Sequence, residues 1–130
     1  ALYEYGDALG IAFQIIDDLL DVEGNLQITG KNIGDDFRER KLTMPFIKAI
    51  QNSSKSELEF WRRTIEKGNQ NNQDWDIALS LMNKYQAITK TRQEAEMWVE
   101  KAKRALSKLP ESEMLILLSE LADYVLTRSK

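Results

Sequence analysis

Apolar side chains occupy almost every face of a helical wheel drawn over residues 3–22. This pattern predicts a helix that is buried inside a helical bundle. The polar face of the same segment carries three aspartates, Asp17, Asp18 and Asp21. On a helix, Asp17 and Asp21 share one face, and Gln14 lies one turn earlier on that face. Because two buried carboxylates side by side repel each other and lose their hydration, a divalent cation would stabilise this arrangement.

Residues 23–44 follow without helical periodicity, and we predict that they form a loop. Gly30 and Gly34 flank Lys31 in this segment. A loop of this length inside a compact domain usually has a function. The loop is therefore a second place to look for functional side chains.

Residues 45–130 return to helical periodicity, interrupted by polar connectors, and contain no strand pattern. The apolar stripes of these helices, with members such as Ile77 and Leu121, are predicted to face the core. Helix starts are predicted near Pro45, after a capping box made by Ser54 and Glu57, at Asp74, near Ile88 and at Glu111.

The composition agrees with one soluble, all-helical domain. The chain has 130 residues, 42% hydrophobic and 30% charged, which is enough for one core but not for two ordinary domains. We expect a single helical domain over residues 1–130, made of a helix (1–22), a functional loop (23–44) and C-terminal helices (45–130). No apolar run reaches the roughly 20 residues of a membrane span, and no secretory signal pattern opens the chain. We therefore expect a cytoplasmic protein without a membrane span.

The chain contains neither cysteine nor histidine. Disulfide frameworks, thiol nucleophiles, Ser-His relays and the usual zinc sites are thereby excluded. The chemistry that remains belongs to carboxylates, lysines and arginines. A net charge of −3 gives no electrostatic reason to expect nucleic acid as a partner.

The aspartate cluster has two interpretations. Carboxylate oxygens are the ligands that Mg²⁺ prefers, and magnesium sites commonly combine one or two carboxylates with waters and a substrate phosphate. Asp18 points about 100° away from Asp17 on a helix and would act through water. The alternative is a helix end whose acids are solvated, which is the commoner origin of such spacing. Burial of the apolar neighbours Ile15, Ile16, Leu19 and Leu20 favours the metal site.

The loop supplies cations that could close on an anion bridged by the metal, namely Lys31, Arg38, Arg40 and Lys41. The alternative is an ordinary solvated loop. The anion-binding interpretation of these cations is supported only by the acidic helix that precedes them. Gln14 could bond a phosphate or a carboxylate, or could pair with another amide inside the bundle.

The pair Asp35-Asp36 also has two interpretations. These acids could orient the lysines of the loop, or they could simply form a turn. We favour the orienting role.

Together these residues resemble the second aspartate-rich region of the trans-isoprenyl diphosphate synthases, the all-helical polyprenyl synthases. The end of the chain, from Leu109 to Arg128, is similar to that of bacterial long-chain, octaprenyl-type members. The resemblance rests on three motifs in order: Gly10-x-x-Phe13-Gln14-x-x-Asp17-Asp18-x-x-Asp21, then Gly30-Lys31-x-x-Gly34-x-Asp36, then Lys41-x-Thr43-x-Pro45.

The resemblance implies the C-terminal portion of the isoprenoid synthase helical bundle. It also implies a Mg²⁺-dependent, head-to-tail condensation of an allylic prenyl diphosphate with isopentenyl diphosphate to give a polyprenyl diphosphate. The implied metal residues are Asp17, which binds directly, and Asp18 and Asp21, which act mostly through water. Lys31 and Lys41 would hold the departing diphosphate, with Phe13 and Gln14 close by, so that Asp17, Lys31 and Lys41 are the implied catalytic residues.

Nothing in the chain matches the family's first aspartate-rich motif. We therefore expect a truncated enzyme that supplies one half-site, is inactive alone, and needs the missing N-terminal portion, with a homodimer when complete. The apolar face of residues 8–20 would then be exposed. Two alternatives are a non-catalytic helical partner subunit of a prenyl synthase and a terpene cyclase or squalene-type synthase.

Overall fold

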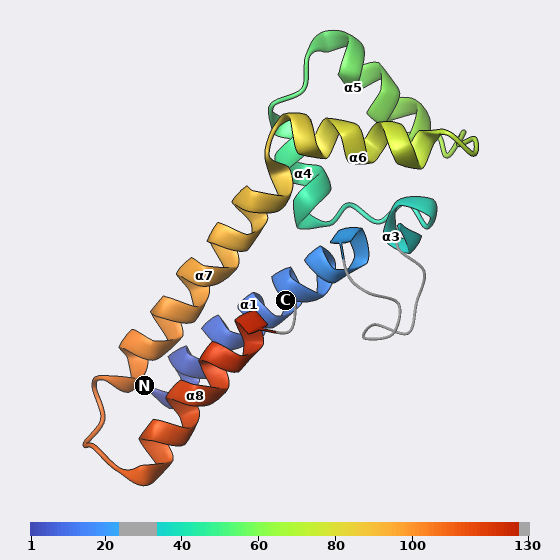
Figure 1. Ribbon diagram of the computed structural model, residues 1–130. Coiled ribbons are helices and arrows are strands. Elements are labelled where there is room, and N and C mark those ends of the chain that lie inside the picture. Colours follow the sequence, from blue (N-terminus) through green and yellow to red (C-terminus); the bar gives the residue numbers. More distant parts are fainter. Residues whose placement is uncertain (24–33, 128–130) are drawn as a thin grey trace. The chain divides into compact units, whose positions relative to one another are not determined.

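The computed structural model describes residues 1–23 and 34–127, and every regular element in these residues is a helix (Figure 1). The predicted all-α fold is confirmed. The chain divides into two compact units, unit 1 with residues 1–17 and 92–130 and unit 2 with residues 18–91. The elements in chain order are α1 (Leu2–Glu23), α3 (Asp35–Arg38), α4 (Met44–Gln51), α5 (Lys55–Trp61), the π-helix η1 (Arg62–Glu66), α6 (Asp74–Lys84), α7 (Ala87–Leu106) and α8 (Glu113–Thr127).

Unit 1 packs the first part of α1 against α8 and the greater part of α7 (Figure 1). The Tyr5 hydroxyl of α1 donates a hydrogen bond to the Leu118 carbonyl of α8, 2.8 Å away. Lys103 of α7 pairs with Asp123 of α8 at 3.0 Å. The core between the helices is built largely from small and branched side chains, which allow close helix packing. Its buried members include Ala8, Ala12, Ile15, Ala95, Val99, Ala102, Leu106, Ala122 and Val125.

Unit 2 is built around aromatic rings contributed by four segments. Phe37 of α3 lies 6.0 Å from Phe46 of α4 and 5.9 Å from Trp75 of α6, measured between ring centroids. Phe46 in turn lies 6.0 Å from Trp61, in an edge-to-face arrangement. Such tilted ring pairs stabilise a core beyond the burial of their surface alone. The aromatic core therefore fixes α3, which follows the predicted functional loop, against α4 and α6.

The predicted capping box is present at the start of α5. The Ser54 hydroxyl accepts from the Glu57 amide at 3.3 Å, and the Glu57 carboxylate accepts from the Ser54 amide at 2.7 Å. The helix that begins at this capping box changes its winding along its length. After Trp61 it continues as the π-helix η1 and ends before Gly68, whose φ is +73°.

The helix start predicted at Asp74 is confirmed as the first residue of α6, and the Asp74 side chain binds residues upstream of that helix. The Asp74 carboxylate is fully buried and accepts two 2.9 Å hydrogen bonds from the Arg63 guanidinium, as well as one from the Asn71 amide. The hydrogen bond from Arg63 holds the pKa of Asp74 below its usual value. The buried Asp74 carboxylate and the partly exposed Arg63 therefore form an ion pair that joins α6 to η1.

Two predicted core positions are exposed: Ile77 is 42% and Leu121 is 48% accessible. On α1, by contrast, Ala12, Ile16 and Leu19 are fully buried. The expectation that the whole apolar face of residues 8–20 is exposed is therefore wrong for most of its members. Within residues 1–23 and 34–127, no helix has the length and apolar character needed to cross a bilayer.

Candidate functional site

The predicted acidic residues lie in the last two turns of α1. Asp17 and Asp18 are partly exposed there, whereas Asp21 is only 1% exposed. Phe13 and Gln14 are both exposed on the preceding turn. About one turn of helix thus separates two accessible carboxylates, Asp17 and Asp18, from a buried one, Asp21.

Asp21, near the end of α1, is hydrogen-bonded to two residues at the start of α3. Its carbonyl accepts the Gly34 amide at 2.9 Å. Its two carboxylate oxygens accept the Asp36 amide at 3.3 and 3.2 Å. Because these bonds satisfy a backbone amide at the start of α3, Asp21 anchors this helix to the end of α1.

Lys41 lies just beyond α3 and is held by the same helix. Its amide donates to the Asp36 carbonyl at 2.8 Å. Its ammonium lies 3.7 Å from the Asp36 carboxylate and 3.6 Å from Glu39, while the side chain stays 61% exposed. Asp36 thus has the contact that the orienting role requires. Lys31, the other predicted diphosphate residue, lies outside the described residues.

Two further residues outside the sequence motifs, Trp75 and Gln70, support α3. Trp75 packs against Gly34, whose φ is +90°, so closely that a Cβ at this glycine would lie 3.0 Å from the ring. The Gln70 amide donates to the carbonyls of Phe37 and Thr64 at 2.9 and 3.0 Å. The positive φ of Gly34 requires glycine, which its presence in the motif could have indicated.

The two arginines near α3 have protein partners. Arg38 pairs with Asp35 at 3.3 Å. Arg40 directs its guanidinium to the carbonyls of Ile65 and Glu66 at the end of η1. Two of the Arg40 donors, Nε and Nη2, are therefore used by carbonyl groups, and the expectation that Arg40 closes on an anion stays a prediction.

The donor set fits magnesium only in part. Within residues 1–23 and 34–127, no three aspartates or glutamates come together as a group that could hold a metal ion. Asp17 and Asp18 are the accessible carboxylates, and magnesium sites often use no more than one or two. Asp21 is buried and bonded to an amide. The fit therefore favours a half-site completed by waters, phosphate and further ligands.

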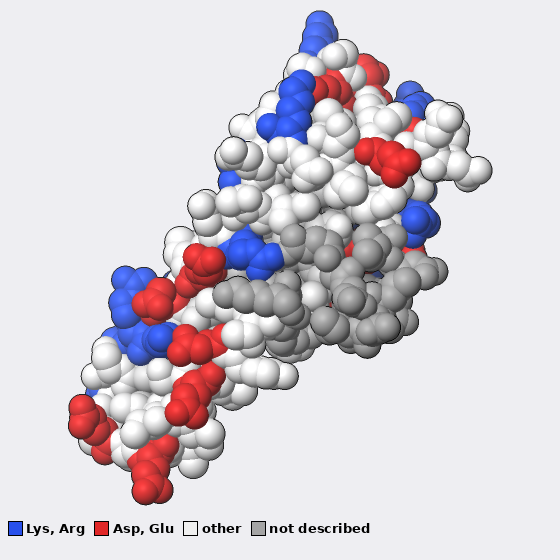
Figure 2. Space-filling view, in the orientation of Figure 1, with Lys and Arg blue, Asp and Glu red and all other residues white. Residues whose placement is uncertain are grey.

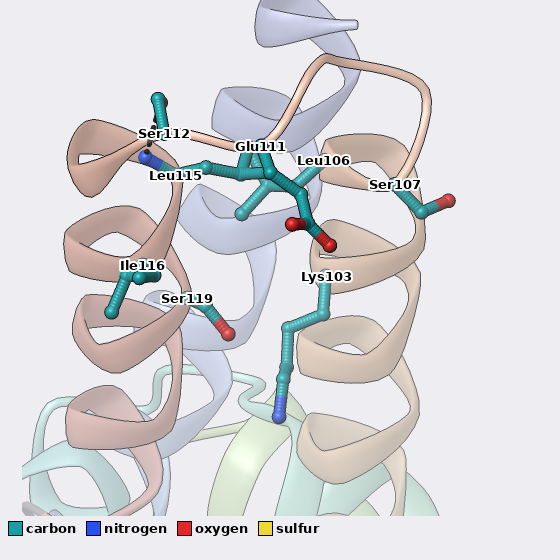
Figure 3. A pocket seen from close by; sticks show the side chains of 8 residues that line it. All are labelled: Lys103, Leu106, Ser107, Glu111, Ser112, Leu115, Ile116 and Ser119. Atoms are coloured by element: carbon teal, nitrogen blue, oxygen red, sulfur yellow. Dashed lines mark hydrogen bonds between the residues drawn. The ribbon is translucent and has the colours of Figure 1, made fainter.

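Two cavities lie in unit 1. One, of about 580 Å³, lies at the turn between α7 and α8, and Lys103, Glu111 and Ser119 are among the residues that line it (Figure 3). Figure 3 also shows the Ser112 hydroxyl accepting the Leu115 amide, so this side chain serves the start of α8. None of the predicted site residues lines this cavity.

A second groove of unit 1, of about 510 Å³, lies along α1 and α8 and is mostly apolar. It includes Phe13, one of the predicted site residues. Its lining consists of Gly6, Leu9, Gly10, Phe13, Leu121, Tyr124 and Val125.

The visible charged surface of unit 1 carries both signs. In Figure 2, the lower part of the molecule shows acidic and basic side chains next to one another, and acidic side chains at its lowest end. Glu4 with Lys108, and Asp123 with Lys103, are two of the opposite-charge pairs. This face therefore has no continuous basic patch of the kind that binds nucleic acid.

The sequence matches a known protein family and is similar to several known proteins. The polyprenyl synthetase family model matches residues 1–82. The octaprenyl diphosphate synthase of Escherichia coli is 40% identical over 93% of this chain, and that of Haemophilus influenzae is 37% identical over 94%. The matches cover 38% and 37% of those relatives, so the chain spans about two-fifths of their length.

Solved structures give the same result. A polyprenyl synthase from Roseobacter denitrificans is 54% identical and superposes with a TM-score of 0.90, covering 98% of this chain and 41% of that one. A polyprenyl synthase from Caulobacter crescentus, solved with calcium and isoprenyl diphosphate, is 41% identical with a TM-score of 0.89, covering 98% and 39%. The family match, the sequence identities and the shared helical fold together show that this chain belongs to the polyprenyl synthetase family.

Proposed function

We propose that this chain supplies one half-site of a Mg²⁺-dependent prenyltransferase. The reaction is the condensation of an allylic prenyl diphosphate with isopentenyl diphosphate, giving a polyprenyl diphosphate. The observation that carries the proposal is the anchoring of α3 by Asp21, because it holds Lys41 on a fixed element that follows the acidic turn of α1. The Caulobacter relative, which binds a divalent cation and an isoprenyl diphosphate, supports this class of ligand.

Each residue has a distinct proposed role. Asp17 is the direct metal ligand and Asp18 acts through metal-bound water, which agrees with their partial exposure. Asp21 contributes through water at most, since its carboxylate is bonded to the Asp36 amide. Magnesium, when bound, would neutralise the charge that develops on the departing diphosphate. The ammonium groups of Lys31 and Lys41 bind that diphosphate.

Phe13 and Gln14 complete the substrate side of the proposed site. Both are exposed one turn before Asp17 on α1. The Gln14 amide can donate to a phosphate oxygen, and the Phe13 ring can contact an apolar prenyl chain. Phe13 also lines the apolar groove along α1 and α8.

The partner of this half-site is the remaining portion of a polyprenyl synthase, and the complete enzyme is a homodimer. Exposed apolar side chains on α1 and α8, among them Phe13, Leu121 and Tyr124, support association with further helices. This chain matches only about two-fifths of the length of its relatives, which agrees with a partner that supplies the remaining portion. The chain alone is expected to be inactive, and its cytoplasmic location stays a prediction.

The proposal is tested with a chimaera in which this chain replaces the matching stretch of the E. coli octaprenyl diphosphate synthase. In that chimaera, Asp17→Ala should lower the Mg²⁺-dependent condensation rate by about 100-fold or more, since loss of even an outer-shell partner of a metal costs about 10–100-fold. Asp7→Ala, which removes an exposed aspartate from the same helix, is the control and should leave the rate unchanged. A normal rate in the Asp17→Ala chimaera would refute the assigned role.

A further inference from the structure

Arg40 has a backbone conformation that L-residues seldom adopt. Its φ is +63°, in the left-handed region, where an ordinary side chain is strained and glycine is not. Within residues 1–23 and 34–127, Gln86 is the only other non-glycine residue with positive φ. The strain at Arg40 persists only if surrounding contacts hold it.

Those contacts come from the end of η1. The Arg40 Nε donates to the Ile65 carbonyl at 2.8 Å, and Nη2 donates to the adjacent Glu66 carbonyl. These are among the last carbonyls of a helix, which lack partners within the helix itself. A planar guanidinium can bond two adjacent acceptors at once, which an ammonium cannot do in the same geometry.

Gly68 leaves the space that the guanidinium fills. A Cβ at this position would lie 2.9 Å from Arg40 Nη1 and 3.0 Å from its Cζ. Gly68 itself has a φ of +73°, so a side chain there would be strained as well. Arg40 and Gly68 therefore form a matched contact between the α3 segment and the end of η1.

Lys41 follows Arg40 directly, so its position depends on this contact. On its other side, Lys41 is tied to Asp36 through the 2.8 Å amide bond and the 3.7 Å ion pair. The short segment from α3 to Lys41 is thus held at both ends. We propose that Arg40 is a positioning residue, which clamps this segment on η1 and thereby fixes the Lys41 ammonium for the substrate diphosphate.

This inference rests on the proposed function, because it needs Lys41 to bind diphosphate. The test compares Arg40→Gly and Arg40→Lys in the chimaera, with Arg62→Gln as the matched control. Arg62 lies on η1, is exposed, and pairs only with the exposed Glu59 among the contacts shown. The measurements are the Kd for inorganic diphosphate in magnesium buffer, the KM for the allylic diphosphate, and the unfolding temperature.

Arg40→Gly should raise the Kd and the KM about tenfold, the size expected for loss of a supporting partner. Its unfolding temperature should change little, because two opposite effects offset each other: glycine relieves the strained φ, which stabilises the fold, and the loss of the Arg40 hydrogen bonds destabilises it. Arg40→Lys should be impaired in binding even though it keeps the charge. Arg62→Gln should match the parent in all three measurements.

A double-mutant cycle with Lys41→Gln separates the possible outcomes. If Arg40 acts through Lys41, Arg40→Gly has no further effect once Lys41 is replaced. If the effects of Arg40→Gly and Lys41→Gln on the Kd multiply in the double variant, Arg40 is a direct anion ligand and the inference is overturned. Normal diphosphate binding by Arg40→Lys would also overturn it. So would an Arg40→Gly variant that loses stability but binds diphosphate normally. If Lys41→Gln itself binds diphosphate normally, the proposed role of Lys41 fails, and this inference fails with it.

Discussion

At the scale of single residues, three aspartates that look alike in the sequence differ in their surroundings. Asp17 and Asp18 remain partly exposed at the end of α1, whereas Asp21 is buried. The difference arises because Asp21 faces the returning chain and accepts the Asp36 amide with both carboxylate oxygens. A residue of the second aspartate-rich motif thus serves the local architecture as well as the proposed chemistry.

Replacing Asp21 should therefore destabilise the fold. Asp21→Ala leaves the buried Asp36 amide without its acceptor, which costs roughly 1–3 kcal/mol of unfolding free energy. Urea denaturation of the 130-residue chain measures this change. Asp7→Ala is the control on the exposed side of α1 and should change the unfolding free energy by no more than about 0.5 kcal/mol. Equal stability of the two variants would contradict the anchoring role of Asp21.

At the scale of elements, helix periodicity predicts where helices form but not how they contact one another. Polar side chains make several of these contacts between helices. Glu57 is the clearest example, because it closes the capping box of α5 and also binds the end of α6. One carboxylate oxygen accepts the Lys84 ammonium at 2.7 Å, and the other accepts the Tyr85 hydroxyl. Hydrogen bonds from Lys84, Tyr85 and the Ser54 amide, in that order, lower the pKa of Glu57 to about 2.

The lowered pKa of Glu57 predicts a pH-dependent stability. The folded chain favours the charged form, with a pKa of about 2 against 4.5 for the ordinary group. The stabilisation is therefore fully present above the ordinary pKa and is lost as the pH falls towards 2. Glu57→Gln should show a weaker decrease of the urea midpoint between pH 5 and 2 than the parent. Glu59→Gln, which removes an exposed carboxylate from the same helix, is the control, and a parallel decrease in both variants would contradict the prediction.

At the scale of the whole molecule, the chain corresponds to about two-fifths of the relatives it matches. Unit 1 exposes apolar side chains on α1 and α8 around the 510 Å³ groove that includes Phe13, Leu121 and Tyr124. Gly6 and Gly10 have open space where a side chain would lie, which would allow another helix to approach closely. This surface is the proposed contact with the remainder of a synthase.

Leu121→Glu tests this surface, because it places a charge in the apolar groove. We expect it to abolish co-purification of this chain with the remaining portion of the E. coli synthase, expressed as a separate polypeptide. The far-UV circular dichroism of the chain alone should be unchanged, since Leu121 is 48% exposed. Met97→Glu is the matched control, since Met97 is 53% exposed on α7 and does not line the groove. Co-purification by Leu121→Glu at the level of this control would contradict the assignment.

Local features of the fold could be predicted from the sequence because their causes lie within a few residues. The capping box of Ser54 and Glu57 spans three positions, and the start of α4 follows from Pro45 in its first turn. The motif from Gly10 to Asp21 also depends only on spacing along one helix, and it led to the family. The site roles of Asp17, Asp18, Lys31 and Lys41 stay predictions.

The longer helices, the acidic face of α1 and the family could be predicted from the sequence, because helix periodicity, caps and motif spacing are local properties. Three contacts became known only from the folded chain: Asp21 accepts the Asp36 amide, Arg40 donates to the end of η1, and Asp74 pairs with Arg63. These contacts join residues 11 to 25 positions apart in the sequence. Which donors meet which acceptors over such distances depends on how the aromatic core packs the segments together, and no local pattern encodes that choice.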